Sequence, residues 1–169
     1  SEKIKVLLKF AILLHDIGKP SVRTKDASEQ IHFYRHEKKS TRMAETILKR
    51  LRFSNHDLRF ITTVISLHQR PLLLYQAHVN NRLTHRAVAR FFMASKDRTP
   101  AVLIHAAADD HGKKADNPPF FKKFIRTMMT RYLSEFEPKQ ALPPLLTGHD
   151  LIREFDLVPS PQFKALLSQ

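Results

Sequence analysis

Two groups of polar residues lie at the ends of apolar segments, and they are the positions at which this sequence could do chemistry. The first is His15 and Asp16 in FAILLHDIGKP, residues 10–20. A histidine nitrogen and a carboxylate oxygen are both ligands for divalent metal ions. An ionised carboxylate in an apolar setting costs several kcal/mol unless it is paired or bound to a cation. The pair therefore favours a metal site, although Asp16 facing solvent and His15 bonded to a carbonyl fit these two residues equally well.

The second group is LIHAAADDHG, residues 103–112, in which acids again end an apolar helix. His105 and Asp109 are four residues apart and share one helix face. The three alanines between them allow a neighbouring helix to approach closely. We expect Asp109 or Asp110 to supply an oxygen ligand to the same cation as the first group. A solvated acidic helix end is the alternative, which the helix dipole disfavours without forbidding it.

Two further histidines lie at the edges of expected helices: His36 in YRHEKK and His68 in SLHQRP. The chain has ten histidines, and we expect most of them to have no ligand role. Four are expected to be ordinary surface or core residues, namely His56, His78, His85 and His149. Three others remain open at this stage, namely His32, His105 and His111.

Helical periodicity recurs along the chain and would position these residues. The first helix, over 3–17, is expected to be buried on nearly all sides, since every position in 6–14 except Lys9 is apolar. Gly18 and Pro20 end it, and 21–35 is expected to be a polar loop. Further helices are expected over 37–51, from the Ser54–Asp57 capping box to about His68, over 85–95, from Thr99 to about Asp110, over 119–136, and after Thr147 and Ser160. With only three glycines and no hairpin signal, the predicted fold class is all-α.

The composition excludes several classes of protein. The chain has no cysteine, which rules out disulfides and thiolate-bound zinc and favours a reducing, cytoplasmic setting. Its apolar runs are far shorter than the roughly 20 residues that span a bilayer, and no signal peptide is visible. Lys and Arg outnumber Asp and Glu by 29 to 16. We therefore expect a polyanionic partner, with nucleic acid favoured over a membrane surface.

The segments LLHDIGKP, HFYRHE, SLHQRP and HAAADDHG, in this order, resemble the HD-domain superfamily of metal-dependent phosphohydrolases. More narrowly, the chain from FAILLHDIGKP to VISLHQRP is similar to the HD region of bacterial tRNA nucleotidyltransferase and poly(A)-polymerase-family proteins. The tail LTGHDLIREFDLVPSPQFKALL resembles the segment that follows that region. The resemblance implies a helical bundle, the HD domain, over 1–136. It implies a linker and the start of a C-terminal helical tail over 137–169.

The resemblance also implies a metal site. His15 and Asp16 match the motif's metal ligands, and the spacing Ala-Asp-x-x-Gly selects Asp109 over Asp110 as the acid from the later helix. Mixed histidine and aspartate ligation suits Mn, Ni, Fe or Zn, and Mg if aspartate dominates. Many superfamily members carry another histidine ligand on an earlier helix, and no histidine precedes His15 here.

The remaining motif residues are implied to face the substrate. His36 and His68 would bind a second metal ion or contact a substrate phosphate. Asp16 is implied to be catalytic together with Lys19, which would face that phosphate. The implied reaction is hydrolysis of a phosphate ester. A phosphate or a 2′,3′-cyclic phosphate at an RNA 3′ end fits both this chemistry and the basic surface.

An RNA-binding helical module without turnover is the rival interpretation. Basic clusters would then hold backbone phosphates of RNA, with tRNA the favoured class: Lys38, Lys39, Arg42, Lys49, Arg50 and Arg52, and Lys113, Lys114, Lys122, Lys123 and Arg126. The family's polymerising head needs a Gly-rich turn followed by a carboxylate pair on a strand, and this sequence has neither. We therefore expect polymerising activity to belong to an N-terminal nucleotidyltransferase domain of a parent protein. The present region could also serve only to position that domain.

Overall fold

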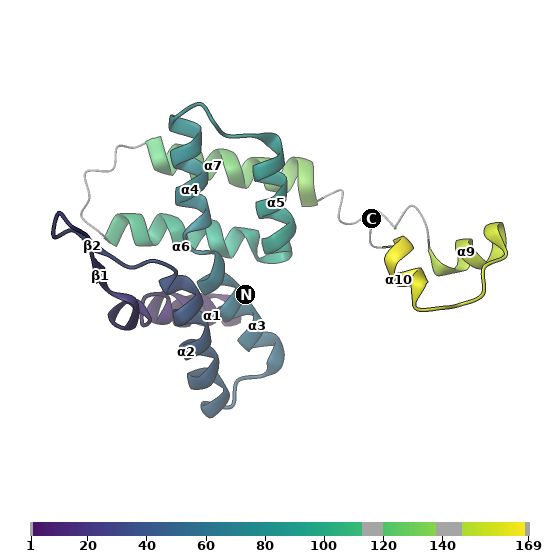
Figure 1. The fold of residues 1–169 in the computed structure, drawn as a ribbon, viewed down its shortest axis with the longest axis horizontal. Helices are drawn as coiled ribbons and strands as arrows, with labels where there is room; N and C mark the ends of the chain where they lie inside the picture. Colours follow the sequence, from purple (N-terminus) through teal and green to yellow (C-terminus); the bar gives the residue numbers. More distant parts are fainter. Residues whose placement is uncertain (1, 113–119, 138–146, 168–169) are drawn as a thin grey trace.

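The computed structural model describes residues 2–112, 120–137 and 147–167 (Figure 1). Its helices are α1 (Glu2–Leu14), α2 (His36–Arg50), α3 (Asn55–Leu67), α4 (Arg70–Val79), α5 (His85–Ser95), α6 (Thr99–Gly112), α7 (Phe120–Arg131), α9 (Gly148–Phe155) and α10 (Gln162–Leu167). Short 3₁₀ turns, η1 (Lys19–Val22) and η2 (Lys96–Arg98), follow α1 and α5, and a π turn, η3 (Tyr132–Phe136), extends α7. The prediction of an all-α fold is confirmed.

Helix α6 is the centre of the bundle. It contacts α1, α3, α4, α5 and α7, and Figure 1 shows it beside α7, with α4 and α5 lying across both. Its buried side chains include Val102, Leu103 and His105, each with an exposed fraction of 0%. A helix with neighbours on so many sides has few positions for charged residues, and α6 has none before Asp109. Asp109 and Asp110, near the end of α6, are therefore partly buried.

The predicted burial of the first helix is wrong. Only Leu7, Ala11 and Leu14 of α1 are buried, a single stripe at spacings of four and three residues that packs against α3 and α6. Ile12 and Leu13 are exposed, Leu13 to 71%. Apolar composition alone does not decide burial, because burial also needs a partner for each helix face.

No helix is expected from the sequence over α4, since Pro71 comes three residues after the expected end of the preceding helix, at about His68. Pro71 instead lies in the first turn of α4, where a proline needs no amide hydrogen and its fixed φ angle suits the helix. The helix ends at Asn80, whose backbone N–H bonds to the carbonyl of Gln76. The consequence is a sharp corner between α3 and α4 that carries His68.

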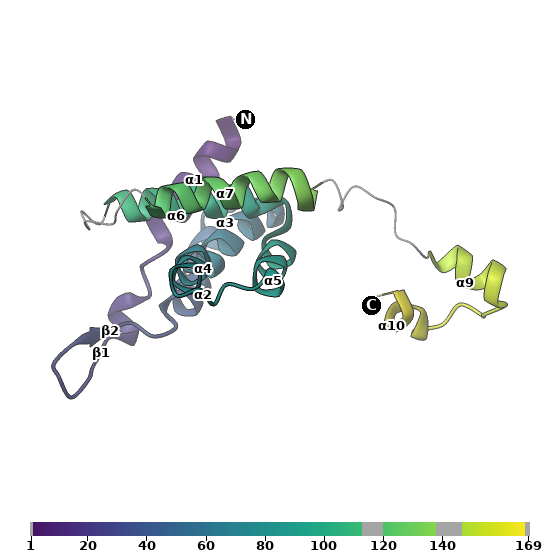
Figure 2. The same cartoon turned by 90° about the horizontal axis from the view of Figure 1, so that it is seen from above.

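The predicted polar loop over 21–35 contains a small antiparallel hairpin, visible at the edge of the molecule in Figure 2. Strand β1 (Thr24–Lys25) pairs with β2 (Ile31–His32), with Thr24 opposite His32. No glycine is needed, because Glu29 adopts a left-handed φ of 62° and the Asp26 carboxylate accepts backbone bonds from Ser28 and Gln30. The sequence therefore carries no glycine signal for this hairpin.

The predicted helix starts are confirmed by their caps. Ser54 Oγ accepts from the Asp57 N–H, and Thr84 Oγ1 accepts from the Ala87 N–H, both at 3.1 Å. In the tail, Thr147 and Asp150 form a complete capping box at the start of α9, which contacts α10. The division into 1–136 and 137–169 stays a prediction, and residues 138–146 of the linker lie outside the described residues.

One face of α7 and η3 is apolar and buried. Its buried members are Phe121, Phe124, Ile125, Met128 and Tyr132, and Phe136 packs at the edge of the same core. Within the described ranges, no helix has both the length and the apolar character that crossing a bilayer requires.

Candidate metal centre

Four elements meet where α1 ends, and each contributes a polar side chain to one cluster. His15 and Asp16 form the turn that follows α1, and His36 is the first residue of α2. His68 occupies the corner between α3 and α4, and Asp109 lies near the end of α6. The residues that the motifs single out, far apart in the sequence, are thus brought together in the folded chain.

Gly18 allows the turn after α1 to pack tightly against α2. Its backbone N–H donates to Ser40 Oγ at 3.0 Å, and a Cβ atom at this position would lie only 2.6 Å from the Ser40 backbone nitrogen. A side chain here would require the backbone to move. Gly18 was predicted only to end a helix, and its further effect is to hold His15 and Asp16 beside the start of α2.

The carboxylate of Asp16 lies between two imidazole rings. Asp16 Oδ2 is 3.1 Å from His15 Nε2, and Asp16 Oδ1 is 3.2 Å from His36 Nε2. Asp109 Oδ1 approaches His15 Nε2 to 3.4 Å, and the Nε2 atoms of His36 and His68 are 3.2 Å apart. One ligand atom from each of His15, Asp16 and His68 lies within 4.8 Å of the other two, a spacing that allows them to share one metal ion.

The backbone orients three of the histidine rings in the same way. In His15, His36 and His68, the Nδ1–H donates to the carbonyl of the residue three positions earlier. The acceptors are the carbonyls of Ile12, Phe33 and Ile65, at 2.7, 2.8 and 2.7 Å respectively. With its proton on Nδ1, a neutral imidazole presents the lone pair of Nε2. Outer hydrogen bonds of this kind fix the tautomer and orientation of metal-binding histidines.

Two nitrogen lone pairs and one carboxylate oxygen face the same point. The Gln69 side-chain amide donates to His36 Nε2 at 3.3 Å, which marks this nitrogen as an acceptor. Burial is the main cause that lowers the pKa of His68 to about 4, so His68 carries no second proton to share near neutral pH. Asp16 Oδ1 is buried and accepts no hydrogen bond from the described residues. A cation at this point would offset the repulsion among these three atoms.

Charge in the metal-free cluster is balanced by protons. Burial works against a charged His15, but hydrogen bonds to Asp109 and Asp16 outweigh it and raise the pKa of His15 to about 9. Burial likewise opposes the ionised form of Asp16, yet His15 and Lys19 hold the pKa of Asp16 well below its usual range. Lys19 Nζ lies 2.5 Å from Asp16 Oδ2. An imidazolium and an ammonium thus supply the positive charge that a metal ion would otherwise provide.

His105 is the cluster residue that the sequence left open. Its exposed fraction is 0%, and within the described part of the chain neither ring nitrogen has a hydrogen-bond partner. The ring centroid lies 4.8 Å from that of His15 and 5.6 Å from that of His68. Burial lowers the pKa of His105 to about 4. A neutral, orphaned imidazole beside four other polar side chains fits a further nitrogen ligand better than an apolar core. The available signal was its position four residues before Asp109.

Access to the cluster is narrow. A hollow of about 50 Å³ adjoins it, lined by His68, Gln69, Leu72, Ala106, Asp109, Asp110 and Phe121. The side chains of Asp16 and Lys19 are 31% and 29% exposed, so they form the solvent-facing edge. Lys19 Nζ also lies 5.6 Å from the centre of the Phe33 ring. The side of the cluster at Lys19 is therefore partly open to solvent.

The other histidines have contacts outside this cluster. His32 pairs with Asp26 and stacks on Tyr34, His56 contacts Asp57, His78 stacks on Phe124, and His85 contacts Arg131. His111 and His149 are exposed. Their geometry gives none of these residues a place beside the aspartate of the first motif.

The predicted nucleic-acid-binding residues fall in two separate regions. The side chains of Lys38, Lys39, Arg42, Lys49, Arg50 and Arg52 are exposed on α2 and just after it, and those of Lys122, Lys123 and Arg126 are exposed on α7. Figure 1 shows α2 and α7 at opposite ends of the bundle. Lys113 and Lys114 lie outside the described residues.

Comparisons with known proteins give a matching family model and two curated relatives. A family model described as "HD domain" matches residues 2–113. An A-adding tRNA nucleotidyltransferase of Deinococcus radiodurans is 26% identical over 165 residues, which cover 96% of this chain and 36% of the relative. A CC-adding tRNA nucleotidyltransferase of Synechocystis sp. is 28% identical over 128 residues, covering 76% of this chain and 28% of the relative. The chain thus spans about a third of the length of the curated relatives it matches.

Proposed function

The chain belongs to the HD domain family, and we propose that its histidine and aspartate cluster binds a divalent metal ion and hydrolyses a phosphate ester. The observation that carries the proposal is the convergence of His15, Asp16, His36 and His68, with the Nε2 lone pairs of His36 and His68 and a carboxylate oxygen of Asp16 turned inward. Local carbonyls hold each ring in this orientation. Two nitrogen lone pairs and a carboxylate oxygen repel one another, and such a group of atoms is expected where a cation binds.

The donor set fits a metal ion through its chemistry. His15, Asp16 and His68 would hold it, with Asp109 and His105 close enough to complete or support the coordination. His36, bonded to Gln69, would contact a second ion or the substrate phosphate. Nitrogen and oxygen donors in this mixture suit Mn, Ni, Fe or Zn, and also Mg. A bound ion would supply Lewis acidity toward a phosphoryl oxygen and toward the attacking water.

Lys19 is the residue of this chain that would position the phosphate. Its ammonium lies at the solvent-facing edge of the cluster, bonded to Asp16 in the absence of a metal. A metal ion on Asp16 would compete for the same carboxylate and leave the Lys19 ammonium able to donate to a phosphoryl oxygen. Charge of this kind stabilises the negative charge that develops during phosphoryl transfer. Lys19 and Asp16 are therefore the two proposed catalytic residues.

RNA processing is the proposed context, because both curated relatives are named as tRNA nucleotidyltransferases. A phosphate or 2′,3′-cyclic phosphate at an RNA 3′ end is the proposed substrate, and tRNA the proposed class of RNA. The net charge of +13 favours such a polyanion. The proposal includes a cytoplasmic location and a parent protein with an N-terminal nucleotidyltransferase domain.

The test compares two aspartates that each contact a histidine. Asp16→Ala removes the central carboxylate of the cluster, whereas Asp26→Ala removes the carboxylate that pairs with His32 in the exposed hairpin. Bound metal is measured after dialysis against Mn²⁺ or Ni²⁺, and hydrolysis is measured with a 2′,3′-cyclic nucleotide. We expect activity to fall on the order of 100-fold in Asp16→Ala only. Equal metal content and equal rates in both variants would contradict the proposal.

A non-catalytic RNA-binding or positioning module is the second candidate. The observation that favours it is the row of exposed basic side chains on α2, among them Lys38, Lys39, Arg42, Lys49 and Arg50. This function predicts tRNA binding that weakens steeply with salt and proceeds without turnover. Filter binding of tRNA between 50 and 200 mM salt, on the order of the range over which such contacts are lost, measures it. A flat response to salt would exclude it.

A further inference from the structure

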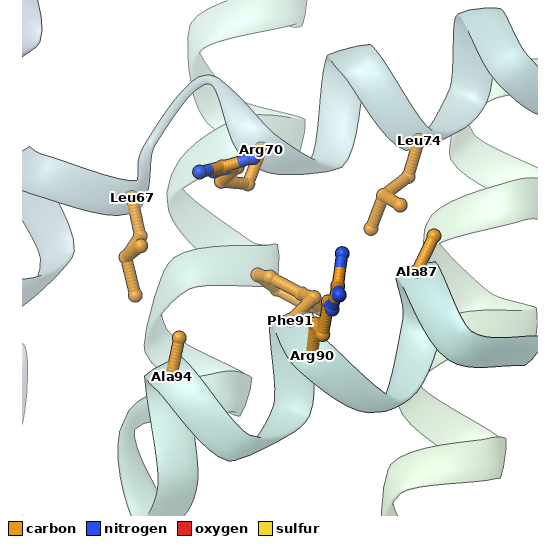
Figure 3. Close-up of a pocket in the computed structure, with 7 residues that line it drawn as sticks. All are labelled: Leu67, Arg70, Leu74, Ala87, Arg90, Phe91 and Ala94. Carbon is orange, nitrogen blue, oxygen red and sulfur yellow. The ribbon is translucent and has the colours of Figure 1, made fainter.

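A second pocket lies between α4 and α5, apart from the metal cluster. Its volume is about 280 Å³. Leu67, Leu74 and Phe91 form its apolar wall, and Arg70 and Arg90 are its two charged residues. Figure 3 shows Arg70 beside the start of α4 and Arg90 extending from α5 toward α4. An apolar hollow with two guanidinium groups at its mouth is a suitable site for an anion with an apolar body.

The two charges are not neutralised within the described part of the chain. Arg70 and Arg90 form no ion pair or side-chain hydrogen bond with any described residue, although other cations such as Lys5, Lys49 and Arg131 do pair with carboxylates. Two like charges at one pocket repel each other, and an anion between them would be attracted to both.

The position of Arg70 adds a second electrostatic repulsion, between its guanidinium and the helix that it begins. Arg70 is the first residue of α4, and the N-terminus of a helix carries partial positive charge. Aspartate or glutamate usually stabilises this position, whereas α4 has no acid in its first turn. An anion bound beside Arg70 would therefore gain from the arginine pair and from the partial positive charge of the helix start.

The pocket is separate from the proposed hydrolase site. The α3–α4 corner divides them, because Leu67 and Arg70 line the second pocket while the intervening His68 and Gln69 face the metal cluster. A ligand in the pocket would thus contact no metal-binding side chain. Binding to it can be measured whether or not the metal cluster turns anything over.

We propose that this pocket binds one nucleotide, with its phosphate between Arg70 and Arg90 and its base against the wall of Leu67, Leu74 and Phe91. A guanidinium group binds phosphate through two parallel hydrogen bonds and also stacks on bases. The volume is near the lower end of small-molecule sites, roughly 300 Å³, which fits one nucleotide. The nucleotide is either free or the terminal residue of an RNA strand.

The main test removes the two charges and compares the result with an equal loss of charge elsewhere. R70Q/R90Q is compared with R59Q/R82Q, since Arg59 and Arg82 are exposed and do not line this pocket. Equilibrium dialysis measures binding of AMP, CMP and ribose 5-phosphate. We expect AMP and CMP to bind at least tenfold more weakly to R70Q/R90Q and within about twofold of the parent to R59Q/R82Q. Ribose 5-phosphate should bind more weakly than either nucleotide, because it lacks the base.

Two further arms distinguish the source of the ligand. Intact tRNA and tRNA without its 3′-terminal nucleotide are each bound to the parent and to R70Q/R90Q. If the double variant weakens binding of intact tRNA but not of the trimmed tRNA, the ligand is the RNA terminus. If AMP alone shows the dependence, the ligand is a free nucleotide. Three results would each overturn the proposal. The first is an equal loss of AMP affinity in R70Q/R90Q and R59Q/R82Q, and the second is no loss in either variant. The third is a polyglutamate peptide, but not AMP, that binds more weakly to R70Q/R90Q than to the parent.

A gain-of-charge variant keeps the proposal testable if R70Q/R90Q folds poorly. Ala94 lines the pocket one helical turn after Arg90, so Ala94→Glu would place a carboxylate at the arginine pair. We expect this variant to unfold at a higher Tm and to lose AMP binding. Ala89→Glu, on the same helix but outside the pocket, is the control. Unchanged AMP binding by Ala94→Glu would contradict a nucleotide site here.

Discussion

Metal binding at the cluster is expected to release about one proton per ion near neutral pH, and that proton comes from His15. The pKa of His15 is raised to about 9, as its hydrogen bonds to Asp109 and Asp16 outweigh the effect of burial. At pH 7 the ring is therefore about 99% protonated in the metal-free protein. A histidine must be neutral to bind a metal ion, so the ion must displace this proton.

The size of the effect follows from the two units between pH 7 and the pKa of about 9. Displacing the proton costs about 3 kcal/mol at pH 7, so the apparent affinity should be about 50-fold lower there than at pH 9, where half of the rings are already neutral. His68 and His105 add nothing, because their pKa values of about 4 leave both rings neutral throughout this range. The slope should approach a tenfold tightening per pH unit below pH 9.

Isothermal titration with Mn²⁺ measures both quantities. Repeating the titration at pH 7 in buffers with different ionisation enthalpies gives the number of protons released, and a series from pH 6.5 to 8.5 gives the slope. Asp26→Ala, outside the cluster, should behave as the parent does. An affinity that is independent of pH, with no proton release, would refute the assignment of the raised pKa to a metal-binding His15.

Three further outcomes are expected. Gly18→Ala should lower the free energy of unfolding by about 1–3 kcal/mol in urea titrations, because its Cβ would meet the Ser40 backbone 2.6 Å away; a neutral result would show that the turn can relax. Lys19→Gln should bind Mn²⁺ more tightly, since no ammonium competes for Asp16, yet hydrolyse a cyclic nucleotide about 100-fold more slowly; unchanged turnover would remove Lys19 from catalysis. His105 has a folded pKa of about 4, below its unfolded value of about 6.5, so its contribution is present above pH 6.5 and lost as the pH falls toward 4. Over this pH range the free energy of unfolding of the metal-free protein should fall by up to about 3 kcal/mol because of this residue, and in His105→Leu it should fall less steeply. An equally steep fall in both proteins would contradict a buried neutral ring.

The part of the site that the sequence could predict is the part encoded in short segments. The HD pair at His15 and Asp16 ends an apolar run, and Asp109 ends another, so each was recognisable within a few residues. His36 and His68 lie at the helix edges where they were predicted. Their mutual approach, with Nε2 atoms 3.2 Å apart, depends on the packing of α2 against α3 and on the corner before α4.

The errors share a physical cause, which is that burial and backbone shape depend on neighbours distant in the sequence. Leu13 is as apolar as Leu14, yet only Leu14 faces a partner helix. Pro71 can end one helix or begin another, and only the tertiary corner decides. His105 lies next to three alanines, and its place in the cluster depends on the packing of α6 at the centre of the bundle.

The bonds from the histidine rings to carbonyls three residues earlier have a consequence for how long an ion would stay bound. Two of the acceptors, Ile12 and Ile65, lie in the last turns of α1 and α3, and the third, Phe33, precedes α2. Helix ends open locally far more often than whole domains unfold. Each opening would free a ring to rotate and withdraw its ligand atom. The dwell time of the ion would then be governed by fraying at helix ends, and strengthening a terminal turn would prolong it without altering any ligand.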